Sequence, residues 1–583
     1  MAPNNVDQVA SAEPVAEIKV EITDTWGGPT EHHTISLYPN KTVRVGRDSS
    51  SVLTLDSEFP LHESAVSRNH LEFYSIVIEE DCDHHPLVYV RDRQSHMGIG
   101  VNDEHIKDTK SITPARLLHH GDKVTIPPHV TFELVQPFAP KLKLSPFQSE
   151  EVKLFGDRFI VMDRTLGNGT SAQVHLAIDR QTGEQLACKV YDMCQLEKTG
   201  NSDMVRRLMQ ETFVRCQMDH PNIAAFRGAY KSHSTLYVFE ELATGGDLFS
   251  LLVRDNHFTE SDVRWMVRQV VHGIAYMHEK GVAHRDLKLE NILCAICPKP
   301  GHRLVVTDFG HSGVIGLERM NVIVGTTGWQ APELLKPPHL HGLPVDIWAI
   351  GVLATQLLAG ASKMEAMDLL DTFARSPCDT KEPAHELDKL FKELFTIRSD
   401  PISEDAKDFI HRCFHVNPQT RITAAEALQH PWLCKPDDDL KKFLQREKET
   451  RSNWKRRQVL RYAVKHLPDL RQKTADGSPY FTHKQHKPNL HAIRRTAEYK
   501  KRMAAEKNKR KRSLMRDDSV LSSNRGLKER SKQTSKEPTR RSQRLLAKTS
   551  NESGKSSTTQ LAESQDEEGY QDWDDRPSKR IKA

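Results

Sequence analysis

A glycine-rich turn followed by a lysine forms the first group of residues in this chain that could bind a phosphate. The turn "LGNGTSAQV" (166–174) stands between two strand-like segments, and its glycines would let backbone amides approach phosphate oxygens. Lys189, in "ACKV", falls on the next predicted strand, from which its ammonium could contact the α- and β-phosphates of a nucleotide. Glu211 falls on a predicted helix and is placed to pair with Lys189. A lone GxG also occurs in ordinary turns, so the motifs that follow decide the assignment.

Three motifs farther along complete the set that phosphoryl transfer requires. "HRDLKLEN" supplies Asp286 to accept the proton of a substrate hydroxyl, Lys288 beside the transferred phosphate, and Asn291 as a magnesium ligand. "DFG" supplies Asp308 for the same metal ions, and "APE" (331–333) ends the segment. Phosphoryl transfer depends on positioned cations and an oriented hydroxyl rather than on covalent chemistry, so these residue types suit it.

In this order, the motifs make residues 157–433 resemble a eukaryotic protein kinase. The resemblance implies an α+β bilobal fold, ATP and Mg²⁺ as cofactors, and protein substrates. It also implies that Asp346 anchors the catalytic loop and that Glu333 pairs with Arg421. The residues that it assigns to nucleotide binding are Leu166, Gly167, Asn168, Gly169, Thr170, Ser171, Ala172, Gln173, Val174, Lys189 and Glu211.

The catalytic motif also indicates the substrate class. Lys288 in "HRDLK" is the mark of a serine/threonine kinase rather than a tyrosine kinase. Asp247, in "ATGGDLF", and Glu290 match positions at which basophilic members of the calmodulin-kinase group hold an arginine upstream of the target hydroxyl. The resemblance therefore implies a preference for Arg-x-x-Ser/Thr. The alternative is that both carboxylates are ordinary solvated groups.

The kinase-like part departs from the family pattern in its loops. Ala172 replaces the third glycine of the glycine-rich turn, a variant that this family tolerates. The segment between "DFG" and "GTT" contains Ser312 and no threonine, so activation by phosphorylation would use Thr326 or Thr327, with Arg285 as the partner of the phosphate. Thr326 matches the position that normally contacts the catalytic aspartate, which favours Thr327.

A second group of polar residues, "SAVSRNHLEFY" (64–74), lies about a hundred residues before the kinase-like part. "VRVGR" lies upstream of this group and "SHMGIGVN" lies downstream. The order of these three motifs resembles that in a forkhead-associated (FHA) domain, a β-sandwich whose loops bind phosphothreonine peptides. The guanidinium of Arg47 and the hydroxyl of Ser67 can reach one phosphate, and Arg68 can add a charge-assisted hydrogen bond. His70 is assigned to holding the loop.

In the strand that follows this loop, successive side chains are predicted to point to opposite faces of the sheet. Leu71 and Phe73 would point to one face of the sheet, and Glu72 and Tyr74 to the other.

The FHA resemblance has one mismatch, at Met97. The family often has an asparagine there, which positions the peptide backbone, so its absence can weaken or redirect peptide binding. Ser95 and His96 remain available at this site.

The chain divides by its sequence pattern into five stretches. Residues 1–16 are polar and are predicted to be disordered. Residues 17–137 contain short strands between turn residues, which indicates a β-sandwich. A proline-punctuated linker (138–156) leads to the kinase-like part (157–433), and a basic helical and low-complexity tail (434–583) follows. The predicted fold class is therefore multidomain: an all-β FHA sandwich, an α+β bilobal kinase, and a charged, largely disordered tail.

Charge is distributed unevenly along the chain. Residues 441–550 hold 34 Lys/Arg and 10 Asp/Glu, whereas the first 440 residues hold 44 and 61. Nine cysteines without regular spacing fit a reducing compartment. The N-terminus lacks the positive start and apolar run of a signal peptide, and the most apolar stretch, 346–361, predicts a buried core helix rather than a membrane span.

The tail contains basic clusters and one amphipathic segment. "KKR" (500–502), "NKRKR" (508–512) and "SKRIK" (578–582) resemble nuclear import signals, which predicts a nuclear protein; the alternative is a solvated tail that contacts nucleic acid without sequence preference. The segment 453–467 has apolar residues at helical spacing. Such a helix could inhibit the kinase, bind calmodulin, or pack on the C-terminal lobe.

An FHA domain followed by a calmodulin-group kinase is the architecture of the DNA-damage checkpoint effector kinases and their meiosis-specific fungal relatives. It implies a nuclear kinase that is recruited to phosphothreonine-containing proteins in checkpoint or meiotic signalling, where crowded copies could phosphorylate each other in trans. The Ser/Thr-Gln pairs lie in the tail rather than before the FHA domain, which favours the meiotic relatives. Two alternatives are a weakly active, phosphopeptide-dependent scaffold and a calcium/calmodulin-regulated kinase.

Overall fold

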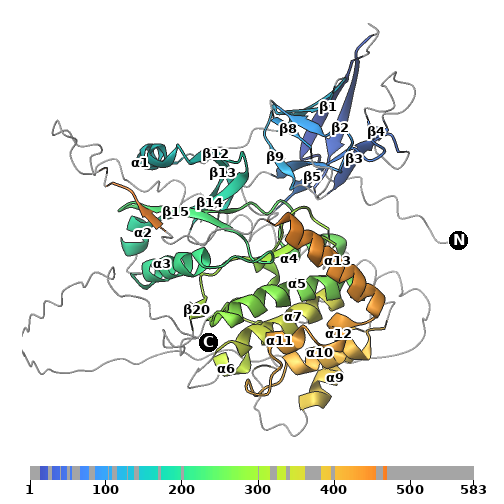
Figure 1. The fold of residues 1–583 in the computed structure, drawn as a ribbon, viewed down its shortest axis with the longest axis vertical. Coiled ribbons are helices and arrows are strands. Elements are labelled where there is room, and N and C mark those ends of the chain that lie inside the picture. The colour runs from blue at the N-terminus through green and yellow to red at the C-terminus, as the bar shows by residue number, and fades with distance from the viewer. Residues whose placement is uncertain are drawn as a thin grey trace, which may run out of the picture. The chain divides into compact units, whose positions relative to one another are not determined.

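The computed structural model contains a strand-rich region near the N-terminus and a two-lobed region after it (Figure 1). The residues that the structure describes are 13–23, 29–39, 41–48, 53–54, 66–77, 86–102, 104–107, 114–127, 129–136, 144–168, 172–198, 202–299, 301–314, 325–335, 342–361, 374, 383–395, 401–454, 464–468 and 470. The basic clusters on which the nuclear prediction depends lie outside them.

The strand-rich region is a sandwich of two sheets. One sheet has the strand order β2-β1-β11-β10-β7-β8, and the other has the order β4-β3-β5-β6-β9. Its strands are β1 (Ala16–Ile22), β2 (Glu31–Leu37), β3 (Thr42–Gly46), β4 (Leu53–Thr54), β5 (Leu71–Ile76), β6 (Leu87–Asp92), β7 (Ile99–Val101), β8 (Glu104–Ile106), β9 (Arg116–Leu118), β10 (Lys123–Ile126) and β11 (Val130–Val135). The predicted all-β sandwich is confirmed.

Alternating side chains fill the space between the two sheets. β1 buries every second residue, because one face of its sheet covers the core and the other faces water. Phe73 of β5 packs against Phe132 of β11, with ring centroids 5.4 Å apart. In β5, however, every residue is buried, so the face that carries Glu72 and Tyr74 is covered as well.

The N-terminal lobe of the two-lobed region is built on one sheet with the order β12-β13-β14-β16-β15-β21. Its strands are β12 (Phe159–Asn168), β13 (Gln173–Asp179), β14 (Gln185–Asp192), β15 (Phe226–Lys231), β16 (Thr235–Glu241) and β21 (Val464–His466). Its helices are α1 (Pro146–Glu151), η1 (Val152–Phe155), α2 (Met193–Lys198) and α3 (Ser202–Cys216).

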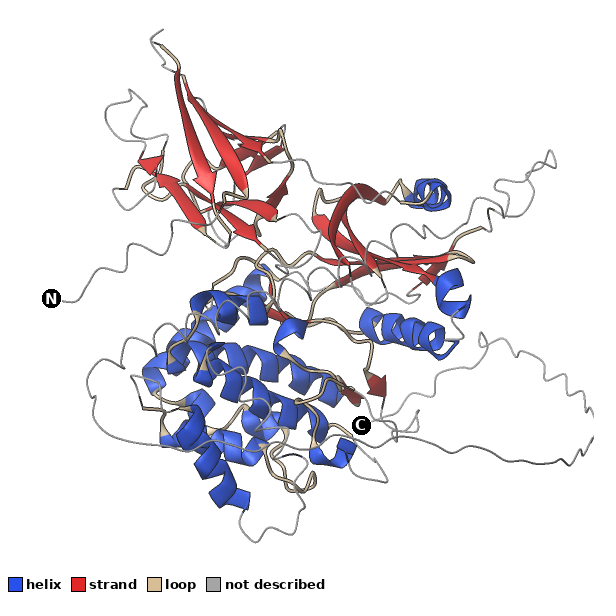
Figure 2. Ribbon diagram, turned by 180° about the vertical axis from the view of Figure 1, so that it is seen from behind, coloured by secondary structure: helices blue, strands red, loops and turns tan. Residues whose placement is uncertain are grey.

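The C-terminal lobe is mainly helical (Figure 2). Its helices are α4 (Leu248–Asp255), α5 (Glu260–Glu279), η2 (Leu289–Asn291), α6 (Pro332–Leu335), α7 (Pro344–Ala359), α9 (Pro383–Leu394), α10 (Glu404–Cys413), α11 (Ala424–Ala427), α12 (Pro431–Cys434) and α13 (Asp437–Asn453). Its short strands are β17 (Val282–Ala283), β18 (Ile292–Cys294), β19 (Leu304–Val306) and β20 (Gly313–Val314). The apolar stretch 346–361 falls largely in α7, whose side chains are nearly all buried, as predicted for a core helix. Among the described residues, no helix combines the length and apolarity needed to cross a bilayer.

The amphipathic tail segment does not form the single helix that its periodicity predicts. α13 ends at Asn453, and residues 464–466 form the strand β21, which pairs in parallel with β15. The amide of Leu467 continues this pairing by donating to the carbonyl of Lys231 at 2.8 Å. The helix prediction is wrong at this end because an open sheet edge offers main-chain partners that local periodicity cannot reveal.

A buried ion pair joins two distant parts of the C-terminal lobe. Arg421 donates from Nη1 to Oε1 of Glu333 at 2.7 Å and from Nη2 to Oε2 at 2.9 Å, as predicted. Nη1 also donates to the carbonyl oxygen of Pro344 at 2.8 Å. Nε donates to the carbonyl oxygen of His415 at 2.9 Å. The Arg421 side chain is 0% exposed, so its charge depends on these buried partners.

We expect Arg421→Met to destabilise the C-terminal lobe by about 3–5 kcal/mol, because it leaves the Glu333 carboxylate unpaired in a buried site. Tryptophan fluorescence during urea unfolding measures this change, since Trp348 lies 5.3 Å from the guanidinium. Arg412→Met is the control: Arg412 pairs with Asp408 where both side chains are at least half exposed, so its loss should cost no more than about 0.5 kcal/mol. Equal losses in the two variants would contradict a special role for the buried pair.

Candidate functional site

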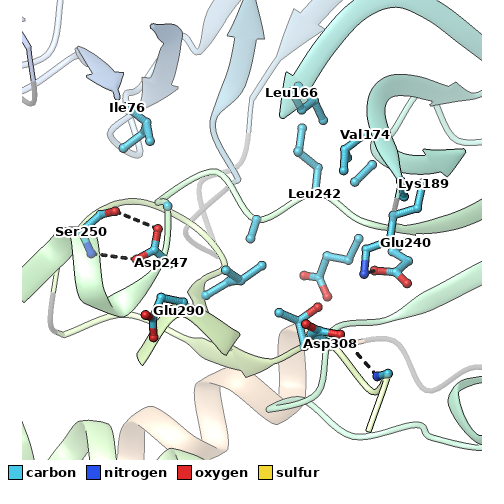
Figure 3. A pocket seen from close by; sticks show the side chains of 18 of the residues that line it. Ile76, Leu166, Val174, Lys189, Glu240, Leu242, Asp247, Ser250, Glu290 and Asp308 are labelled. Carbon is cyan, nitrogen blue, oxygen red and sulfur yellow. Dashed lines mark hydrogen bonds and ion pairs between the residues drawn. The ribbon is translucent and has the colours of Figure 1, made fainter. Parts of the chain in front are cut away.

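A cavity of about 670 Å³ lies where the two lobes meet (Figure 3). That volume is typical of pockets that hold small molecules. Its apolar lining includes Leu166, Val174, Ala187, Leu242 and Leu293. Its charged lining includes Lys189, Glu211, Glu240, Asp247, Glu290 and Asp308. One cavity therefore contains Lys189, Asp308 and Glu290, which are predicted to bind nucleotide, metal and substrate. Asp286, Lys288 and Asn291 are not among the residues that line it.

The predicted glycine-rich turn is described only in part. Leu166, Gly167 and Asn168 end β12, and Gln173 and Val174 begin β13. Ala172 borders the cavity. The predicted nucleotide-binding residues Gly169, Thr170 and Ser171 lie outside the described residues.

Lys189 forms its ion pair with Glu240 rather than with Glu211, the partner that the sequence predicts. Nζ of Lys189 lies 3.6 Å from Oε2 of Glu240 (Figure 3). Nη1 of Arg215 lies 3.1 Å from Oε1 of the same carboxylate. Burial by itself would lower the pKa of Lys189, but the nearby carboxylates, led by Glu240, raise it above its ordinary value. The ammonium therefore stays charged inside the cavity. A glutamate inside the apolar strand "LYVFEE" was the signal that could have identified Glu240.

Glu211, the predicted partner of Lys189, lies on α3 and lines the same cavity. Burial raises the pKa of its carboxyl group, while the charges of Lys189 and Arg215 oppose that effect. Glu211 thus acts on Lys189 electrostatically, and Glu240 is the carboxylate within ion-pair distance.

Asp346 anchors the backbone of the catalytic loop, as the kinase resemblance implies. Oδ2 of Asp346 accepts a hydrogen bond from the amide of His284, and Oδ1 accepts one from the amide of Arg285, both at 2.8 Å. Arg285 has a φ of 67°, a left-handed conformation that non-glycine residues adopt at a cost, so the loop requires such an anchor.

Asp286 lies in a network with three polar side chains. Thr326 donates from Oγ1 to Oδ1 of Asp286 at 2.7 Å, and Lys288 donates from Nζ to Oγ1 of Thr326 at 2.8 Å. Nζ of Lys288 is also 3.2 Å from Oδ2 of Asp286. Nδ2 of Asn291 donates to the Asp286 backbone carbonyl at 2.7 Å. The sequence predicted this convergence, including the contact between Thr326 and the aspartate, while Thr327 is exposed.

The donor atoms of Asn291 and Asp308 fit a magnesium ion. Because Nδ2 of Asn291 is engaged with Asp286, Oδ1 is the atom that would coordinate the ion. Burial would raise the pKa of Asp308, but Lys189 and His284 outweigh it and lower the pKa, so the carboxylate is ionised. Magnesium prefers such hard oxygen ligands and takes the rest from water and phosphates.

The two carboxylates assigned to a substrate arginine have different surroundings (Figure 3). Asp247 caps α4, accepting from the amide of Ser250 at 2.7 Å and from its hydroxyl at 2.8 Å. Burial raises the pKa of Asp247. Glu290 lines the same cavity and is exposed, which makes it the better placed of the two to bind an incoming cation.

The predicted phosphopeptide residues meet at one end of the sandwich. The amide of Arg47 donates to the carbonyl of Ser67 at 3.3 Å, so the end of β3 lies beside the loop that carries Ser67 and Arg68. A Cβ on Gly46 would lie 2.1 Å from the carbonyl oxygen of Arg68, which explains the glycine before Arg47. The side chains of Arg47 and Arg68 are exposed.

His70 holds this loop, as predicted. Its Nδ1 accepts from the amide of Ser67 at 3.1 Å, and its Nε2 lies 3.0 Å from the carbonyl of Gly98. The hydroxyl of Ser67 accepts from the amide of His96 at 2.9 Å. Met97, the mismatch with the FHA pattern, is 39% exposed beside this contact.

Two protein-family models match parts of this chain. The protein kinase domain family model matches residues 160–433, and the FHA domain model matches residues 43–127. A crystal structure of Rad53 residues 1–466 in complex with AMP-PNP aligns over 72% of this chain and 100% of that chain, with 23% identity and a TM-score of 0.37.

Two curated relatives show the extent of the similarity. The calcium/calmodulin-dependent protein kinase cmkB of Emericella nidulans is 33% identical over 47% of this chain and 65% of its own length. The meiosis-specific serine/threonine-protein kinase mek1 of Schizosaccharomyces pombe is 30% identical over 415 residues, which are 69% of this chain and 83% of the relative. The chain therefore belongs to the family of serine/threonine protein kinases that carry an FHA domain.

Proposed function

We propose that this kinase is recruited to phosphothreonine-containing proteins and there transfers the γ-phosphoryl group of ATP to serine or threonine in an Arg-x-x-Ser/Thr context. Two observations carry the proposal: the hydrogen-bonded network of Asp286, Lys288 and Thr326, and the cavity that Lys189 and Asp308 line.

Asp286 is the proposed base for the substrate hydroxyl. As the hydroxyl oxygen forms its bond to the γ-phosphorus, its proton passes to the Asp286 carboxylate and the bond to the leaving ADP oxygen breaks. Lys288, whose Nζ is 3.2 Å from Oδ2 of Asp286, places a positive charge beside the transferred group. Lys189 would orient the α- and β-phosphates.

Asn291 and Asp308 are the proposed holders of magnesium. When bound, magnesium neutralises charge on the phosphates during transfer. Asp308 has a φ of 61°, and this unusual backbone conformation directs its carboxylate toward the cavity that it lines.

The cellular setting of this activity is also a proposal. The similarity to a relative named as meiosis-specific supports a role in meiotic or DNA-damage checkpoint signalling, and the basic tail supports nuclear localisation. Tethering of two copies to one scaffold would raise their effective concentration to about the millimolar range and favour phosphorylation in trans, for which the exposed Thr327 is the proposed acceptor.

Asp286→Asn should abolish most phosphoryl transfer while preserving nucleotide binding, because an amide of the same shape cannot accept the proton. We expect kcat for an Arg-x-x-Ser peptide to fall by about 10²–10⁴-fold. Radiolabel transfer from ATP measures kcat, and calorimetric titration with ADP measures binding. Asp438→Asn, on an 84% exposed side chain of α13, is the control and should keep full activity. If the wild type transferred no phosphate in any activation state, the chain would act as a phosphopeptide-dependent scaffold.

Glu290→Gln should weaken the preference for arginine three residues before the target hydroxyl. Losing one charge-assisted contact should reduce the ratio of kcat/KM for Arg-x-x-Ser over Ala-x-x-Ser peptides by about tenfold. The same substitution at Glu404, which is 88% exposed on α10, should leave the ratio unchanged. An unaltered ratio in Glu290→Gln would remove this residue from substrate selection.

Arg47→Ala should prevent binding of phosphothreonine peptides, because its guanidinium is proposed to hold the phosphate. Each charge-assisted hydrogen bond contributes about 1.5–3 kcal/mol, so affinity should fall by at least about tenfold. Binding of the full chain to an immobilised phosphothreonine peptide library, with and without phosphatase, measures the effect.

Arg44→Ala is the matched control, since Arg44 lies on β3, the strand that ends just before Arg47, and is likewise exposed and positively charged. It should bind within about twofold of the wild type. Equal losses for Arg44→Ala and Arg47→Ala would show that general positive charge, not a phosphate pocket, binds the peptides.

A further inference from the structure

The outer face of the sheet that contains β5 and β6 is buried rather than open to water. Tyr74 and Tyr89 are 1% and 2% exposed, and their rings stack with centroids 5.5 Å apart. Together with Ile76 they belong to an apolar cluster that also contains Leu166 and Leu242 of the kinase domain. If the FHA domain were joined to the kinase domain by the linker alone, this face would be exposed to solvent.

Polar contacts fix this face against the segment that joins the two kinase lobes and against the C-terminal lobe. The hydroxyl of Tyr74 donates to the carbonyl of Thr244 at 3.0 Å and lies 3.3 Å from the carbonyl of Ile296. Nζ of Lys299 lies 3.2 Å from Oε2 of Glu72, a carboxylate whose side chain is 1% exposed. Paired polar groups at a covered face give the contact a defined geometry.

The same sheet also contacts the N-terminal lobe. The side-chain amide of Gln185 makes two hydrogen bonds with the backbone of Leu117: Oε1 accepts from its amide at 2.9 Å, and Nε2 donates to its carbonyl at 3.1 Å. Nη1 of Arg116 donates to the carbonyl of Gly183 at 3.0 Å. The FHA domain therefore contacts both lobes of the kinase domain.

Three side chains of this sheet line the nucleotide cavity itself. Ile76, Leu87 and Tyr89 border the same space as Lys189 and Asp308. Figure 3 shows Ile76 at the edge of the drawn residues, above Asp247 and Ser250 and on the side away from Lys189 and Glu240.

Gly246 permits this close approach. A Cβ on Gly246, whose φ is +73°, would lie 3.3 Å from Cγ2 of Ile76, closer than ordinary van der Waals contact.

We propose that the FHA domain supplies one wall of the nucleotide pocket, with Ile76 as a residue that determines nucleotide affinity. The proposal rests on the use of ATP in the proposed function. The cavity keeps a volume of about 670 Å³ with this wall in place, which is large enough for a small-molecule ligand, so the domain forms a wall and not a plug. A peptide-reading domain thereby becomes a structural part of the catalytic site.

The test is calorimetric titration of the full chain with ADP in the presence of magnesium. Ile76→Ala removes apolar surface from the wall and should weaken ADP binding by about five- to tenfold. Ile35→Ala is the matched control: Ile35 packs, partly buried, against the sandwich core, and its truncation should leave the Kd within about twofold of the wild type.

Lys299→Glu tests the contact between the FHA and kinase domains by changing a kinase residue that does not line the cavity. Its new carboxylate would face Glu72 and separate the two surfaces, so ADP binding should weaken as it does in Ile76→Ala. Because the Lys299 side chain is 32% exposed, the variant should fold, and retained binding of the phosphothreonine peptide library checks that the FHA domain is intact.

The outcomes separate this proposal from the proposed function. Unchanged or tighter ADP binding in both Ile76→Ala and Lys299→Glu would overturn the proposal that the FHA domain forms a wall of the nucleotide pocket. If the chain bound ADP with the expected dependence on Ile76 but transferred no phosphate, the catalytic proposal would be overturned. The proposed role of the FHA domain in the nucleotide pocket would still hold.

Discussion

The structure of the nucleotide cleft depends on keeping the Lys189 ammonium charged inside a buried cavity. Burial alone lowers the pKa of a lysine, and a neutral amine would attract phosphates poorly. Glu240, at 3.6 Å, counters the desolvation and is itself held by Arg215 at 3.1 Å. The guanidinium of Arg215 also lies 4.9 Å from the centre of the Phe309 ring. One buried carboxylate thus couples the lysine strand, helix α3 and the "DFG" segment.

A second constraint is the backbone conformation of the catalytic segments. Arg285 and Asp308 both adopt positive φ angles, which cost free energy in residues with a Cβ. The surrounding contacts maintain them: Asp346 accepts hydrogen bonds from the amides of His284 and Arg285, and Asp308 accepts one from the amide of Gly310 at 3.3 Å. The segment before Asp286 therefore takes its geometry from a distant buried partner, Asp346, whereas the conformation at Asp308 is supported by a local hydrogen bond two residues along the chain.

The two phosphate-related sites are connected through one strand. β5 begins one residue after His70, which holds the loop of the proposed phosphothreonine pocket, and it ends at Ile76 beside the nucleotide cavity. Glu72, between them, pairs with Arg93, whose Nη1 donates to Asn69 of the same loop at 3.3 Å. A strand paired on both sides is a stiff element, so the peptide loop and the cavity wall share a rigid support.

The sequence by itself determined the sandwich and the two-lobed kinase fold, and it selected the proposed catalytic residues, because their motifs combine fixed residue types with fixed spacing. It also anticipated the pairing of Glu333 with Arg421 and the contact of Thr326 with Asp286. Only the tertiary structure decided that Lys189 pairs with Glu240, that residues 464–466 join β15 as a strand, and that the outer face of β5 is buried. Each of these depends on contacts between segments far apart in the chain, and periodicity within one segment carries no information about which distant surface will cover it.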